Sequence, residues 1–206
     1  MHTTSLTAGT VIFDILSCDS AAELMAELRE EAEAILPDLA TNPRRVRDMW
    51  KLDSVIRETL RLHPLFGHGS FREVVAPGGI TTPEGLFLPQ GSCVCALVAQ
   101  VQREKAGEDG AVYRPLRFYE EAQLNPDKRQ TPAVQIGDKL IGFSLGAHSC
   151  PGRFFAVQTV KLMIAKLMRD YDFKPLAERP RFREIASAAE PPPKAKVTLR
   201  RRKVEA

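Results

Sequence analysis

One cysteine between two glycines limits the possible folds of this chain more than any other feature. Cys150 lies in the stretch FSLGAHSCPGRFFA, with Gly146 before it and Gly152 after it. The apolar spacing of the residues that follow predicts a helix, so Cys150 would lie one step before a helix N-terminus. Backbone N–H groups are unpaired at such an end and the helix dipole is positive, which favours a thiolate over a thiol.

The neighbours of Cys150 suggest what a thiolate would do there. The two glycines allow tight turns and leave room for a flat ligand, while Phe143 can cover the site from water. A thiolate with space for a planar macrocycle is typical of an axial haem ligand. Two other interpretations stay open, a buried structural cysteine and a nucleophile in a thiol-dependent enzyme, since His148 is two residues away. No third group that would orient such a base is evident.

A charged pair in the stretch RETLRLHP carries a second signal. Glu58 and Arg61 are three residues apart on a predicted helix and share that segment with several apolar residues. At least one of the two is therefore expected to be partly buried, and a buried pair needs further hydrogen bonds. The alternative is an ordinary exposed helix pair.

Composition limits the classes of function. With 44% hydrophobic and 27% charged residues over 206 positions, the chain can form a globular domain with a real core. The net charge of +3 is too small and too dispersed to indicate nucleic acid as a partner. The main basic cluster, LRRRKVEA, fits a solvated strand end or tail. No stretch approaches the ~18 apolar residues that a membrane span requires.

The other cysteines do not indicate a disulfide scaffold. They are widely spaced apart from Cys93 and Cys95, and no secretory signal precedes them, which favours a reducing compartment. Alternation would place Cys93 and Cys95 on one face of a strand, where we expect packed core cysteines. A zinc site would need two further ligands that the sequence does not supply.

Periodicity and turn residues predict a fold that is mainly α with a small antiparallel β-sheet. Ser20 and Glu23 form a capping-box pattern ahead of one helix. The expected segments are a helix over 1–17, helices over 20–64, a small β-sheet over 71–99, a long polar segment over 103–152, a helix over 153–172 and a C-terminal β region over 173–206.

Three motifs together resemble one family. Phe143, Gly146, His148, Cys150 and Gly152 fit the haem-thiolate signature of the cytochrome P450 family at every fixed position. Glu58 and Arg61 match the family's Glu-x-x-Arg motif. Arg117, in YRPLRF, would complete its Glu-Arg-Arg triad and could pin the long polar segment beneath the haem. The motifs occur in family order, so the chain is similar to the C-terminal part of the P450 fold, in its fungal microsomal type.

The resemblance implies a cofactor and its ligands. Haem b would bind through Cys150 as the axial ligand of the iron, within the loop that contains Phe143, Gly146 and Gly152. His148 would be a partner of a haem propionate, and Arg72 in SFREV occupies the place of another. Without a haem, His148 would be a loop-capping histidine and Arg72 an exposed strand arginine.

The stretch HTTS resembles the distal helix of fungal members of the family. There an acid–alcohol pair helps to protonate bound oxygen, and His2 and Thr3 stand at the acid and alcohol positions. We therefore expect less than half of a full-length member in this chain. The membrane anchor, most of the distal helix and nearly all of the substrate pocket would be missing.

For the intact protein, the resemblance implies a monooxygenase that hydroxylates a terpenoid or another secondary metabolite. Its partners would be a small hydrophobic substrate and an NADPH-dependent flavoprotein reductase. Intact members reside in the endoplasmic reticulum membrane, whereas a chain without the anchor would be cytoplasmic or of unknown location. The alternative is a truncated, catalytically inactive haem-binding remnant. A truncated gene product, a wrongly delimited gene and one piece of a split protein are all compatible with such a chain.

Overall fold

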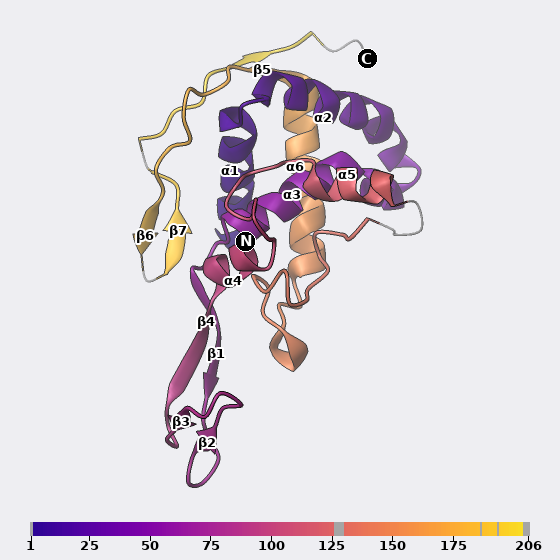
Figure 1. The fold of residues 1–206 in the computed structure, drawn as a ribbon. Helices are drawn as coiled ribbons and strands as arrows, with labels where there is room; N and C mark the ends of the chain where they lie inside the picture. Colours follow the sequence, from indigo (N-terminus) through magenta and orange to yellow (C-terminus); the bar gives the residue numbers. More distant parts are fainter. Residues whose placement is uncertain (1, 126–129, 186, 193, 204–206) are drawn as a thin grey trace.

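The fold was analysed in a computed structural model that describes residues 2–125, 130–185, 187–192 and 194–203. Within these ranges the chain is mainly helical with small antiparallel sheets (Figure 1), which confirms the predicted fold class. The helices are α1 (His2–Ser17), α2 (Ala21–Ile35), α3 (Trp50–Leu62), α4 (Val98–Glu104), α5 (Arg117–Leu124) and α6 (Arg153–Asp170), with short 3-10 helices η1 (Leu36–Ala40), η2 (Pro43–Asp48) and η3 (Gly146–His148).

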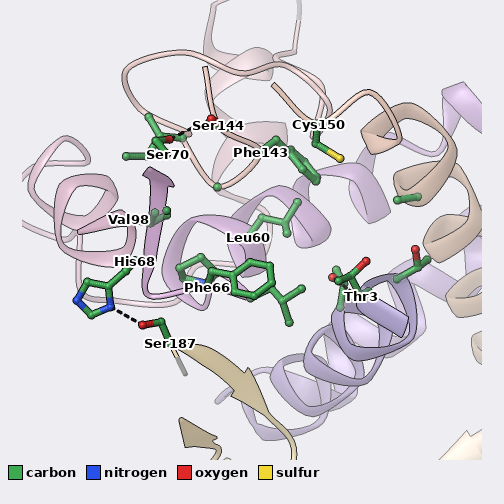
Figure 2. A pocket seen from close by; sticks show the side chains of 18 of the residues that line it. Thr3, Leu60, Phe66, His68, Ser70, Val98, Phe143, Ser144, Cys150 and Ser187 are labelled. Atoms are coloured by element: carbon green, nitrogen blue, oxygen red, sulfur yellow. Dashed lines mark hydrogen bonds between the residues drawn. The ribbon is translucent and has the colours of Figure 1, made fainter. Parts of the chain in front are cut away.

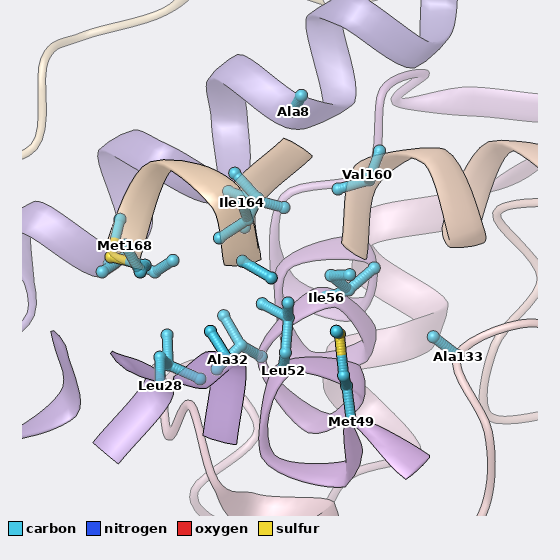
Figure 3. Packing of buried hydrophobic residues seen from close by; sticks show 14 of the residues in the cluster. Ala8, Leu28, Ala32, Met49, Leu52, Ile56, Ala133, Val160, Ile164 and Met168 are labelled. Carbon is cyan, nitrogen blue, oxygen red and sulfur yellow. The ribbon is translucent and has the colours of Figure 1, made fainter. Parts of the chain in front are cut away.

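The core forms where α6 packs against α1, α2 and α3. Val160, Ile164 and Met168 recur every fourth residue along α6, so they lie on one face of the helix. All three are buried, and Figure 3 shows them facing side chains such as Leu28 of α2 and Ile56 of α3. The helix that follows Cys150 is therefore also the central element of the hydrophobic core.

One helix start differs from the sequence-based expectation, and another is capped by a side chain from a different helix. The capping-box prediction is wrong for α2, because Ser20 makes no side-chain capping bond and only its carbonyl accepts the Leu24 amide. The N-terminus of α3 is capped from another helix instead. Glu31 of α2 accepts hydrogen bonds from the backbone amides of Lys51 (2.8 Å) and Leu52 (2.9 Å). Burial of this carboxylate raises the pKa of Glu31.

The strands form four two-stranded antiparallel sheets. Sheets β1–β4 and β2–β3 make an arm that extends from the helical body (Figure 1), where the sequence indicated one sheet. The pairs are β1 (His68–Glu73) with β4 (Cys93–Leu97), β2 (Ile80–Thr81) with β3 (Phe87–Leu88), β5 (Tyr171–Phe173) with β8 (Leu199–Arg201), and β6 (Arg183–Ile185) with β7 (Ala188–Glu190).

The expectation that Cys93 and Cys95 are core residues is wrong. Alternation along β4 does place both on one face of the strand, but that face is exposed. The reason is that β4 belongs to a sheet of only two strands, and its thiol-bearing face is turned to solvent. In the described ranges, no three or more His, Cys, Asp and Glu side chains gather in a group that could hold a metal ion.

The long polar segment contains more regular structure than its sequence indicated. Helix α5 lies inside it and packs against α3. None of the helices in the described part of the chain has both the length and the apolar character that crossing a membrane requires.

Candidate functional site

The loop before α6 holds Cys150 by backbone hydrogen bonds. The Cys150 amide donates to the Phe143 carbonyl (2.8 Å), which closes the loop. Two residues inside it have left-handed backbones, Gly146 with φ of 66° and Ser144 with φ of 62°. Glycine adopts this region freely, whereas serine does so only when its surroundings hold it there. The loop therefore turns back on itself and presents Cys150 two residues before Gly152, the N-cap of α6, and not one step before the helix as the sequence indicated.

The thiol of Cys150 faces a cavity. Cys150 is exposed, and it contributes to the wall of a cavity of about 490 Å³ (Figure 2). Gly152 is the N-cap of α6 and lies beside the sulfur. A Cβ atom at Gly152 would stand 4.0 Å from the Cys150 Sγ, in van der Waals contact, so the glycine keeps that side of the sulfur uncovered.

The cavity lies between α6, α3 and the N-terminal turns of α1. Most of its side chains are apolar, among them Ile56, Leu60, Leu65, Phe66, Val98, Ile141, Val157 and Val160. Its polar residues are Thr3, Thr4, Thr7, His68, Ser70, Ser144, His148, Cys150 and Ser187. No Lys, Arg, Asp or Glu is among the described residues that line it. The cavity therefore suits a largely apolar occupant.

Several residues singled out in the sequence meet at this cavity. Phe143, His148 and Thr3 line it together with Cys150, and Thr3 comes from the opposite wall (Figure 2). The Thr7 hydroxyl donates to the Thr3 carbonyl (3.0 Å), within the first turns of α1. The cavity thus has a thiol on one side and threonine hydroxyls on the other.

Two other candidates are placed differently. Arg72 does not line the cavity, and its guanidinium donates to the backbone carbonyls of Phe71 (2.7 Å) and Leu145 (3.3 Å). Its contact with Leu145 nevertheless puts it beside the cysteine loop, residues 143–150. His2 begins α1, but its side chain lies outside the described part of the structure.

The residues present fit the haem that the signature implies. The wall beside the Cys150 thiol is formed by small or branched apolar side chains of α6, Ala156, Val157 and Val160, which leave space for a flat apolar group. The thiol supplies a soft ligand for iron. The anionic edge of such a group would need donors, and His148 provides one at the wall.

Glu58 is the centre of a buried ionic network. Its carboxylate accepts two hydrogen bonds from Arg61, at 2.7 and 2.8 Å, and further bonds from Arg117, the shorter at 3.2 Å. The Glu58 side chain is 0% exposed. Arg61 also donates to the Gly110 carbonyl (2.6 Å), while Arg117 forms an ion pair with Asp109 at 2.8 Å. These bonds attach the segment that contains residues 109–117 to α3.

Asp109 is the partly exposed end of this network. Hydrogen bonds from Arg117, and secondarily from Arg114, lower the pKa of Asp109 from its ordinary value of 3.8 to about 2. The carboxylate is therefore charged at neutral pH and becomes protonated only as the pH approaches 2.

Gln102 is a positioning residue that sequence reasoning missed. Its amide is 0% exposed and donates to the carbonyls of Leu60 (3.0 Å) and Arg61 (2.9 Å) in the last turn of α3. Its oxygen accepts the amides of Ile141 (2.8 Å) and Gly142 (3.0 Å), just before the cysteine loop. One side chain thus joins α3 to that loop. No sequence pattern indicated it, because all four partners are backbone groups far away in the chain.

Lys161 and Asp53 form a second buried pair that the sequence analysis missed. Lys161 Nζ lies 2.6 Å from Asp53 Oδ1, and both side chains are at most 5% exposed. The other carboxylate oxygen accepts the Ala133 amide at 2.7 Å. This pair links α6 to α3. The sequence did contain a signal for this pair, a lysine within the apolar face of α6, because an ammonium group would not be buried there without a partner.

Comparison with known proteins gives a consistent result. A family model described as "Cytochrome P450" matches residues 1–199. The chain is 36% identical to cytochrome P450 monooxygenase pbrC of Penicillium brasilianum and 35% identical to polB of Polytolypa hystricis. Each match covers 98% of this chain and 40% of the relative. It is also 34% identical, over 84% of its length, to lnaC of Aspergillus flavus. The chain spans about two fifths or less of the length of these curated relatives.

The burial of Glu58 leads to a stability prediction. We expect Glu58→Ala to lower the free energy of unfolding by about 3–5 kcal/mol, because it leaves the buried Arg61 without a carboxylate partner and removes one of the two carboxylates that Arg117 contacts. Urea unfolding followed by circular dichroism measures this loss. The control is Glu120→Ala, which breaks an exposed pair with Arg114 and should cost at most about 1 kcal/mol. Equal losses in the two variants would contradict a central role for Glu58.

The four bonds of Gln102 lead to a second prediction. Gln102→Leu leaves buried backbone groups of α3 and of the cysteine loop unpaired, at about 1–3 kcal/mol for each group that finds no new partner. We expect faster hydrogen exchange at the Ile141 and Gly142 amides, measured by NMR. Gln100→Leu makes the same change at an exposed position of α4 and should leave both amides protected. Unchanged exchange in Gln102→Leu would refute the assigned role.

The low pKa of Asp109 predicts a pH dependence. A carboxylate whose folded-state pKa lies below its unfolded value stabilises the fold at a pH above the unfolded value, near 3.8, and loses this effect as the pH falls toward 2. The melting temperature of wild type should therefore exceed that of Asp109→Asn at pH 6, and the gap should shrink between pH 4 and pH 2. A gap that stays constant over this range would show that the charge of Asp109 is not responsible.

Proposed function

Because the chain belongs to the cytochrome P450 family, we propose that it forms the thiolate-bearing part of a haem monooxygenase that oxidises a small apolar molecule. The observation that carries this proposal is the thiol of Cys150, which opens into a largely apolar cavity at the start of α6. The other thiols of the chain, those of Cys18, Cys93 and Cys95, are not among the residues that line this cavity.

Haem b is the cofactor of this family, and named residues would hold it here. Cys150 Sγ would ligate the haem iron, with Phe143, Gly146 and Gly152 shaping the loop around it. His148 would donate to a propionate. Arg72, whose guanidinium bonds the Leu145 carbonyl of the same loop, is the second proposed donor.

When bound, the haem would supply the activation of oxygen and its insertion into a C–H bond. The residues of this chain would prepare the site for that chemistry. Thr3 carries a hydroxyl group on the wall opposite the thiol. We propose that this hydroxyl delivers a proton during the reaction. His2, at the acid position, is proposed to assist it. Phe143 and the apolar side chains around it would exclude water, which strengthens electrostatic interactions in the cavity.

Substrate and partners follow from the family and the cavity. The uncharged lining favours a small hydrophobic substrate, and we infer a terpenoid or another secondary metabolite. The matched relatives are named cytochrome P450 monooxygenases and come from fungi. An NADPH-dependent flavoprotein reductase would supply the electrons. We place the intact protein at the endoplasmic reticulum membrane.

The thiolate role is tested by spectroscopy. The chain is loaded with haem b, reduced and exposed to carbon monoxide. We expect wild type to show the red-shifted Soret band that a thiolate ligand produces, and Cys150→Ala to lose it, because no other cysteine of the chain lines the cavity. Cys95→Ala, which removes an exposed thiol on the β arm, should keep the band. The same band in Cys150→Ala, or no red-shifted band in wild type, would reject the proposal.

A further inference from the structure

A polar pair stands at the end of the cavity remote from the thiol. His68 of β1 and Ser187, in the turn between β6 and β7, both line the cavity, and His68 Nδ1 lies 2.9 Å from Ser187 Oγ. Figure 2 shows this pair on the opposite side of the cavity from Cys150, with Phe66 and Leu60 between them. The side of the pair that faces this cavity is thus mainly apolar, whereas Ser187 also borders a second pocket that contains Arg183 and Glu184.

The backbone holds Ser187 in place. Its carbonyl accepts the Gly67 amide at 2.8 Å, and the Ala189 amide donates to the Leu65 carbonyl at 2.7 Å. These bonds attach the β6–β7 turn to the segment before β1. Ser187 has a φ of 66°, in the left-handed region that serine rarely adopts. Such a conformation persists only when neighbouring structure enforces it, and it is a pointer to function.

The pair offers one kind of recognition. The Ser187 hydroxyl has one proton and two lone pairs, and the Nδ1 atom of a histidine donates or accepts according to its tautomer. If Nδ1 donates to Oγ, the hydroxyl proton is free for a ketone oxygen. If Nδ1 accepts it, the lone pairs of Oγ are free for a substrate hydroxyl. A charged group that entered through this cavity would meet no Lys, Arg, Asp or Glu among the described residues that line it, which disfavours its binding there.

We propose that His68 and Ser187 form an anchor for one neutral oxygen, a hydroxyl or a ketone, of an otherwise apolar substrate. This inference rests on the proposed function and adds the chemical class of the substrate and its orientation. An oxygen bound at the pair directs the apolar remainder of the molecule toward the Cys150 end. The anchor therefore selects which end of the substrate is oxidised.

The experiment measures binding to the chain without added haem. The probes are cyclooctanol, cyclooctanone, cyclooctane and cyclooctanecarboxylate, which share one ring and differ in the attached group. Protein-observed NMR titrations give their dissociation constants. We expect the alcohol and the ketone to bind about 3- to 10-fold more tightly than cyclooctane, the range that one net hydrogen bond provides. The carboxylate should bind most weakly of the four.

Variants test the assignment to Ser187. Ser187→Ala removes the hydroxyl, so the alcohol and the ketone should fall to the affinity of cyclooctane, whose own dissociation constant stays the same. Ser187→Gly also removes the hydroxyl and suits the left-handed backbone, so it gives the same answer if the alanine variant folds poorly. The control is Ser144→Ala. Ser144 lines the same cavity, has a φ of 62° and is bonded to Ser70, and its variant should keep the preference for oxygen.

The inference is overturned if no probe binds, if wild type shows no preference for the oxygen-bearing probes, or if both Ser187 variants retain that preference. An equal loss of preference in Ser144→Ala also overturns it. None of these results depends on haem or on the thiolate. The carbon monoxide spectrum of Cys150→Ala therefore decides the proposed function separately from the anchor.

Discussion

The buried carboxylate of Glu58 is the constraint on which the rest of the structure depends. A charge with no exposure to solvent is tolerated only when partners neutralise it and fill its hydrogen-bonding positions. Arg61 supplies two of these bonds from the same helix, and Arg117 supplies others from a distant segment. Arg117 also pairs with Asp109. Because the buried carboxylate of Glu58 needs Arg117 as a partner, a long, otherwise irregular stretch of chain is held against α3.

Helix α3 in turn positions the cysteine loop. Gln102 forms hydrogen bonds with carbonyls in the last turn of α3 and with the amides of Ile141 and Gly142, so the end of α3 sets the position of the start of the loop. Lys161 and Asp53 connect the same helix to α6. Helix α6 has two roles, because its apolar face forms the core while its N-terminus carries Cys150. Stability and the position of the thiol are therefore coupled, since the same bonds support both.

The cavity is chemically asymmetric along its length. Cys150 belongs to one end, and His68 and Ser187 belong to the other, with apolar side chains between them. Three serines with left-handed backbones, Ser70, Ser144 and Ser187, line it. Backbone hydrogen bonds close the loop that contains Ser144 and tie Ser187 to Gly67, which makes such conformations tolerable there.

The sequence by itself determined the helical frame, the cysteine signature and the expectation that at least one of Glu58 and Arg61 would be partly buried, because these depend on spacing within one segment. It could not reveal Gln102 or the partner of Lys161, since their contacts join residues far apart in the chain. It also misplaced Cys93 and Cys95, because alternation states which residues share a face and not what covers that face. Only the tertiary structure decided that the thiol of Cys150 and the His68–Ser187 pair share one cavity. The physical reason is that a cavity wall is assembled from several segments, and packing alone brings those segments together.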